Sequence, residues 1–149
     1  MDKVFVSHNE SDTAEVARKI AGVSKRGDVW ALSGTLGAGK SVFARAFIQS
    51  LTDAKEVPSP TFTLVQMYDA GSFDIFHYDL YRLENPAEMF ELGVEEAFYS
   101  GVCLVEWPEK MGAFAPRDMW RVQIDVEDGI RKITISAATE EKISRLQNV

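Results

Sequence analysis

An eight-residue segment in the first third of the chain has the residue types that bind a phosphate chain. Residues 34–41 read Gly-Thr-Leu-Gly-Ala-Gly-Lys-Ser, which matches the pattern G-x-x-x-x-G-K-[ST] at every position. Glycines let the backbone amides curl around an anion without obstruction by side chains. The lysine supplies positive charge for the β and γ phosphates, and the serine hydroxyl can bind Mg²⁺. The segment predicts a nucleoside triphosphate site whose contacts are Gly34, Leu36, Gly37, Ala38, Gly39, Lys40 and Ser41.

A Mg²⁺-nucleotide site also needs an acidic residue at the end of a neighbouring apolar strand. Two residues satisfy this requirement: Asp79 ends the run 75–79, and Glu106 ends the run 102–106. Spacing alone does not decide which of them binds the metal and which orients water. A polar loop that contains Thr61 follows the phosphate-loop helix, and in nucleotide switches such a loop carries a hydroxyl that senses the γ-phosphate.

The identity of the base is inferred by elimination. Guanine-specific switches use an Asn/Thr-Lys-x-Asp motif and an Asp-x-x-Gly motif, and the chain contains neither. Adenine is therefore favoured. Small-metabolite kinases close an arginine-bearing lid over the transferred phosphate, whereas the arginines that follow residue 41 are scattered. Their distribution argues against a kinase without excluding one.

The surrounding elements are those that a phosphate loop requires. A short apolar run at 29–32 predicts a buried strand before the loop, and Phe43, Ala46, Phe47 and Leu51 form one face of a helix after it. Two prolines at 58 and 60 predict a loop. Further strands are predicted at 64–68, 73–78, 101–106, 121–126 and 130–136, with turns at 69–72 and 128–129. Helices are predicted to begin at 85, at 139 and within 9–12, a stretch that offers several caps.

These elements predict a single α/β domain over residues 1–149, of the P-loop NTPase type. Its central sheet is mixed, with parallel strands and antiparallel hairpins, and helices flank it. At the N-terminal helix, Asp12 followed by Glu15 fits a capping box, and Val16, Ala17 and Ile20 recur at helical spacing.

Composition limits the function classes. The 149 residues carry 16 basic and 23 acidic side chains, a formal charge of -7, which argues against direct binding of a nucleic acid backbone. One cysteine rules out an internal disulfide framework and suits a reducing compartment. No apolar run approaches the ~18 residues of a membrane span, and no secretory signal is visible, so we expect a cytoplasmic protein with no membrane role.

Four motifs together resemble the TsaE family, the small P-loop ATPases of bacterial tRNA threonylcarbamoyladenosine synthesis. The resemblance covers nearly the whole chain. Members usually have threonine where Ser41 stands, and serine keeps the hydroxyl. In order, the motifs are the phosphate loop at 34–41, Ser-Pro-Thr-Phe-Thr-Leu at 59–64, His-Tyr-Asp-Leu-Tyr-Arg-Leu at 77–83, and Leu-Val-Glu-Trp-Pro at 104–108.

The resemblance implies roles for individual residues. Lys40 would bind phosphate, Ser41 and Glu106 would hold Mg²⁺, Thr61 would belong to the switch loop, and Asp79 would be needed for hydrolysis. Trp107 would belong to the functional set. The adenine pocket would lie near Glu10 and Ser11 at the first helix and near Gly129 in the last hairpin.

The resemblance also implies partners. Family members work with TsaD and TsaB, which transfer threonylcarbamoyl to the adenosine next to the anticodon, so that contact with tRNA is indirect. The ATP cycle would reset that complex between turnovers. Two alternatives stay open at this point: a small-metabolite kinase, and a nucleotide-gated adaptor that binds ATP without needing to hydrolyse it.

Overall fold

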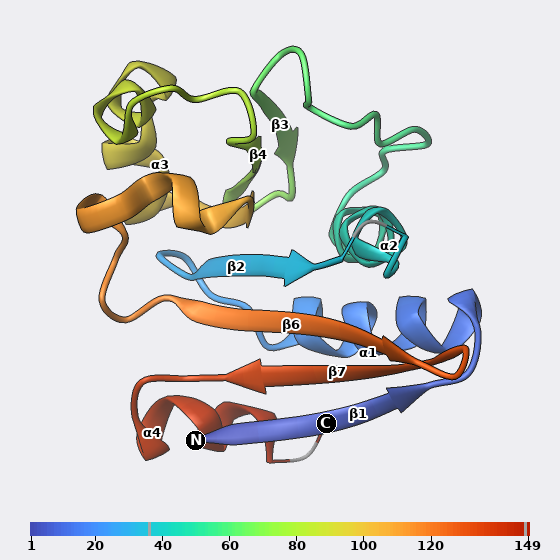
Figure 1. The fold of residues 1–149 in the computed structure, drawn as a ribbon. Helices are drawn as coiled ribbons and strands as arrows, with labels where there is room; N and C mark the ends of the chain where they lie inside the picture. Colours follow the sequence, from blue (N-terminus) through green and yellow to red (C-terminus); the bar gives the residue numbers. More distant parts are fainter. Residues whose placement is uncertain (36, 148) are drawn as a thin grey trace.

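A seven-stranded mixed sheet forms the centre of the computed structural model, which describes residues 1–35, 37–147 and 149 (Figure 1). The strand order is β1-β7-β6-β2-β5-β4-β3. Strand β2 pairs in parallel with both β6 and β5, and β5 pairs in parallel with β4. The hairpins β3-β4 and β6-β7 and the β1-β7 pair are antiparallel. The strands are β1 (Asp2–Ser7), β2 (Val29–Gly34), β3 (Val65–Asp69), β4 (Asp74–Asp79), β5 (Val102–Glu106), β6 (Trp120–Glu127) and β7 (Ile130–Ser136).

The helices divide between the two faces of the sheet. Helices α1 and α2 share one apolar core with β2, β6 and β7, and η1, α3 and η2 surround a second core. The mixed α/β architecture predicted from the sequence is confirmed, and strand β1 is an addition to it. The helices are α1 (Glu10–Gly22), α2 (Lys40–Leu51), η1 (Pro86–Leu92), α3 (Val94–Ser100), η2 (Pro108–Phe114), α4 (Glu140–Ile143) and η3 (Ser144–Leu146), where η denotes a 3-10 helix.

Strand β2 lies between the two cores, which explains its uninterrupted apolar sequence. Trp30 and Leu32 belong to the core under α1 and α2, whereas Val29 and Ala31 belong to the opposite one. The Trp30 ring stacks on the Trp120 ring of β6 with their centroids 4.6 Å apart. Burial on both faces is what a central parallel strand requires. The strand that leads into the phosphate loop is thus fixed from both sides.

The first helix begins earlier than the predicted capping box. Asn9 is the N-cap, and its side chain accepts a hydrogen bond from the Asp12 amide at 2.8 Å. In return, the Asp12 carboxylate accepts one from the His8 amide at 2.9 Å. The prediction that Asp12 and Glu15 form the box was wrong, because Asn9 is an equally good cap three residues upstream. Glu15 instead pairs with Arg18.

The remaining loops, turns and helix caps follow the prediction. Residues 52–64 form no strand or helix, the turn at 70–73 joins β3 to β4, and Asn85 caps the helix that opens with Pro86. That helix is a 3-10 helix. None of the helices in the described part of the chain has the length and apolar sequence needed to cross a bilayer.

Gly34, where β2 ends, is required for close packing and gives the first prediction. A Cβ atom there would come within 2.8 Å of the backbone oxygen of Ile124 on β6. We expect Gly34→Ala to lower the free energy of unfolding by about 1–3 kcal/mol, because strand backbone must move to admit the methyl group. The measurement is unfolding in urea.

Gly22 provides the matched control, since a Cβ there would meet nothing within 4 Å. Gly22→Ala should leave the free energy of unfolding unchanged or raise it by up to ~1 kcal/mol, because alanine is the better helix residue. Equal stabilities of the two variants would contradict the close approach of Gly34 to β6.

Candidate functional site

The phosphate-loop segment lies between β2 and α2, in the strand–loop–helix context that its chemistry requires. Gly37 and Gly39 have φ angles of 83° and 106°, in the left-handed region that side-chain-bearing residues rarely adopt. Gly39 is the N-cap of α2, and no acidic side chain occupies the first turn of that helix. The positive end of the helix is therefore available to an anion. Leu36, predicted as a contact, lies outside the described residues.

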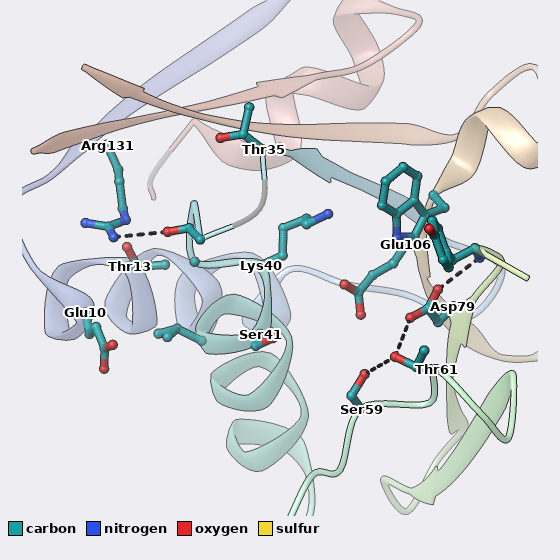
Figure 2. A pocket seen from close by; sticks show the side chains of 16 residues that line it. Glu10, Thr13, Thr35, Lys40, Ser41, Ser59, Thr61, Asp79, Glu106 and Arg131 are labelled. Carbon is teal, nitrogen blue, oxygen red and sulfur yellow. Dashed lines mark hydrogen bonds between the residues drawn. The ribbon is translucent and has the colours of Figure 1, made fainter. Parts of the chain in front are cut away.

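A cavity of about 700 Å³ opens over this loop (Figure 2). Its volume is within the usual range of small-molecule and cofactor sites, roughly 300–1,000 Å³. Lys40 and Ser41 lie between its two ends (Figure 2). Residues of the loop 52–64 and of the ends of β4 and β5 line one end, and residues of α1 and β7 line the other. The first set is Ser59, Thr61, Asp79, Tyr81, Glu106 and Trp107, and the second is Glu10, Thr13 and Arg131.

The two strand-end carboxylates meet at the first end of the cavity, which we call the acidic end. Asp79 and Glu106 are register partners on the parallel strands β4 and β5. Both residues are buried, with 5% and 8% of their surface exposed. Parallel strands end at the same edge of a sheet, so this proximity follows from topology.

The two carboxylates differ in what already binds them. Asp79 accepts hydrogen bonds on both oxygens, from the Thr61 hydroxyl at 3.0 Å and from the Tyr81 amide at 3.0 Å. Thr61 is itself within 2.8 Å of the Ser59 hydroxyl. Glu106 uses Oε2 in its one side-chain hydrogen bond to a described residue, and Oε1 has none. Glu106 thus retains an oxygen that can bind a cation, and Asp79 is tied to the loop.

The acidic end fits Mg²⁺ by its donor set. The described residues contain no cluster of three or more His, Cys, Asp or Glu side chains that could hold a metal. Mg²⁺ in nucleotide sites needs only one or two protein oxygens, with phosphates and water completing the shell. Ser41 and Glu106, both lining the cavity, can supply those oxygens.

Trp107 lies beside the lysine of the loop. The Lys40 Nζ atom is 5.0 Å from the centroid of the Trp107 ring, within cation–π range. The ring also contacts Tyr81, with centroids 4.9 Å apart. Trp107 has a φ angle of 58°, which is rare for a bulky residue and costs about 1–3 kcal/mol. Such strain is typical of functional sites.

Arg131 is the charged lining residue that the sequence did not predict, and Thr13, Ser59 and Tyr81 are further lining residues that it did not predict. Its guanidinium donates hydrogen bonds to the backbone oxygens of Ala38, at 2.9 Å, and Gly37, at 3.4 Å. These contacts join residues more than 90 positions apart, so no local pattern points to them. The only signal was an arginine two residues after Gly129 in the turn of the last hairpin.

The other predicted contacts are placed as follows. Ala38 is buried and contacts Arg131 through its backbone. Glu10 lines the end of the cavity near Arg131. Ser11 lies in an adjoining groove between α1 and α2, and Gly129 is in the β6-β7 turn; neither lines the cavity. Adenine binding by Glu10, Ser11 and Gly129 stays a prediction.

Comparison with known proteins agrees with this geometry. Residues 7–133 match the family model described as threonylcarbamoyl adenosine biosynthesis protein TsaE. The chain belongs to the TsaE family. The family resemblance carried by the four sequence motifs is therefore confirmed.

Individual relatives extend over most of the chain. A protein of Bacillus subtilis (strain 168), named tRNA threonylcarbamoyladenosine biosynthesis protein TsaE, is 37% identical over 151 residues, which cover 95% of this chain and 93% of that one. The Rickettsia felis protein of the same name is 37% identical over 131 residues, covering 87% and 77%. The crystal structure of Bacillus subtilis YdiB matches with a TM-score of 0.78 and 30% identity, over 99% and 97% of the two chains.

The bond between Arg131 and the phosphate loop gives the second prediction. Arg131→Ala should weaken binding of ATP, the nucleotide favoured by the sequence, about tenfold, or ~1.4 kcal/mol. The reason is that two loop oxygens lose the charged donor that holds them. Isothermal titration calorimetry measures the change.

Arg121 on β6 is the matched control, because it is exposed and does not line the cavity. Arg121→Ala should bind ATP within twofold of the unaltered protein. If Arg131→Ala also bound within twofold, the arginine would have no part in holding the loop for nucleotide.

Proposed function

We propose that this protein binds and hydrolyses ATP with Mg²⁺, and that this cycle acts as a switch on the TsaB–TsaD complex during threonylcarbamoyladenosine synthesis on tRNA. The observation that carries the proposal is one cavity that joins phosphate-loop residues to two strand-end carboxylates, in a chain of the TsaE family. The relatives' names supply the pathway, and the cavity supplies the chemistry.

Phosphate binding falls to the loop. The backbone amides between Gly34 and Ser41 and the start of α2 would surround the β and γ phosphates. Lys40 would leave the Trp107 ring and neutralise phosphate charge, since a triphosphate attracts the ammonium more strongly than a ring face does.

Ser41 and Glu106 would hold Mg²⁺, which neutralises charge that develops on the phosphates. Asp79 remains fixed to the switch loop through Thr61, and in that position it would orient the attacking water. Thr61 would sense whether a γ-phosphate is present, because its hydroxyl lines the cavity beside Asp79. Adenine and ribose would lie toward Glu10, Thr13 and Arg131, at the opposite end.

An indirect role at tRNA agrees with the charge of the chain. A formal charge of -7 favours binding to another protein over binding to an RNA backbone. A kinase receives less support, because Arg131 is the one arginine among the described residues that line the cavity, and it already binds the loop. TsaB and TsaD, the partners that the family resemblance implies, are the proposed partners.

The third prediction tests the ATPase. Lys40→Ala should reduce ATP hydrolysis at least a hundredfold, or ~2.7 kcal/mol of transition-state stabilisation, because it removes the charge that binds phosphate. Phosphate release is measured for the protein alone and after addition of TsaB and TsaD. We expect a slow basal rate that rises on addition.

Lys55→Ala is the control, because Lys55 is an exposed lysine of the loop after α2 that does not line the cavity. Hydrolysis by Lys40→Ala at the unaltered rate would overturn the proposal. Labelled γ-phosphate that appears on a small molecule, and not as free phosphate, would establish the kinase in its place.

The fourth prediction separates a hydrolysing switch from an adaptor. Asp79→Ala removes the acceptor of the Thr61 and Tyr81 hydrogen bonds but leaves the phosphate loop unchanged. We expect ATP affinity within about threefold of the unaltered protein, loss of hydrolysis, and no rescue of cells that lack the chain. Rescue by a variant that binds but does not hydrolyse ATP would instead identify an adaptor.

A further inference from the structure

A buried histidine contacts the carboxylate at the acidic end of the cavity. His77 lies on β4 opposite Leu104 of β5, two residues before Asp79 and on the same face of the strand. Its Nε2 atom is 2.7 Å from Oε2 of Glu106. The side chains of His77 and Glu106 are only 3% and 11% exposed, so water does not compete strongly for this contact.

The direction of this hydrogen bond follows from the chemistry of its partners. An ionised carboxylate only accepts hydrogen bonds, so Nε2 carries the hydrogen and donates it to Glu106. The other ring nitrogen, Nδ1, is buried and has no hydrogen-bond partner among the described residues. Glu106 is thus the polar partner that accounts for a histidine at this position.

Packing alone does not explain a histidine here. Its neighbours on this face of the sheet, Ile75 and Leu104, are fully buried and apolar. An imidazole with an unpartnered nitrogen is less stable in such surroundings than an aliphatic side chain would be. A position that bears this cost is more readily explained by the group that the histidine holds.

We propose that His77 is a positioning residue for Glu106, and that it fixes this carboxylate with Oε1 directed to the Mg²⁺ site. The inference rests on the proposed function, because it requires Glu106 to be the metal ligand. Asp79 is held by its own donors, Thr61 and Tyr81, so His77 serves Glu106 alone. Residues that orient a metal ligand in this way typically change metal affinity 10–100-fold when they are replaced.

The physical gain is preorganisation. A glutamate side chain has several rotatable bonds, and fixing them costs free energy when a metal binds. The hydrogen bond from His77 fixes the carboxylate beforehand, so less freedom is lost on binding. Removal of the donor should weaken Mg²⁺ binding but leave metal-free nucleotide binding, which depends on the loop, nearly unchanged.

The fifth prediction tests this separation with three variants of His77. The affinity for a non-hydrolysable ATP analogue is measured in EDTA, and the Mg²⁺ concentration that half-saturates the nucleotide complex is measured separately. His77→Gln places an amide donor near the position of Nε2, and His77→Asn places the same group one bond short. His77→Leu removes the donor. Ile75→Val is the control, because Ile75 lies on the same face of the strand and its side chain has no donor for Glu106.

We expect His77→Gln to stay within about threefold of the unaltered half-saturating Mg²⁺ concentration, and His77→Asn and His77→Leu to raise it roughly 10–100-fold. All variants should bind the analogue in EDTA within twofold. Thermal unfolding shows which variants are folded. If His77→Leu does not fold, the comparison of His77→Gln with His77→Asn still tests the positioning role.

Three results would overturn the positioning role alone. Two of them are an unaltered Mg²⁺ dependence in His77→Asn and an equal shift in Ile75→Val. A third is a matching loss of affinity in EDTA, which indicates a structural role. Failure of the proposed function looks different, because the unaltered protein would then show no analogue binding, or no dependence of that binding on Mg²⁺.

Discussion

The site depends on one backbone constraint, the short connection between the end of β2 at Gly34 and the start of α2 at Lys40. The strand is buried on both faces, and the helix is capped by Gly39, which has a left-handed φ angle. Gly34 allows the end of β2 to approach the backbone of β6 closely, and Arg131 holds the loop from β7. These contacts fix the helix N-terminus above the sheet edge, where an anion can reach it.

Sheet topology then determines what faces that N-terminus. Because β2, β5 and β4 are neighbouring parallel strands, their carboxyl ends meet at one edge. Asp79 and Glu106 reach the cavity for this reason, although 27 positions separate them in the sequence. The antiparallel hairpins β6-β7 and β3-β4 widen the sheet. They place Arg131 and Asp79 at the two ends of the cavity. The positions of the two carboxylates therefore follow from the pairing order of the strands.

Local sequence patterns were enough to predict the helices, the strands and the two carboxylates of the acidic end. They could not predict contacts between residues that are distant in the sequence. The phosphate loop, the strand-end carboxylates and the hairpins follow from short-range rules of spacing, turns and apolar runs. Arg131 and His77 carry no such signal, because each acts on a partner distant in sequence. The capping box was misplaced because several good caps stand side by side at residues 9–12, and the structure uses Asn9, two residues after the end of β1.

The two ends of the cavity differ in how they connect to the surface. At the far end, Arg131 binds loop oxygens and Thr13 is buried against Ser7, so the contacts lead into the fold. At the acidic end, Thr61 is followed by Phe62, a side chain 78% exposed, which stacks with Arg82. If the nucleotide changes the hydrogen bond between Thr61 and Asp79, the change would thus move the next residue, the exposed Phe62. Under the proposed function, the acidic end is the side at which a partner would detect the nucleotide state.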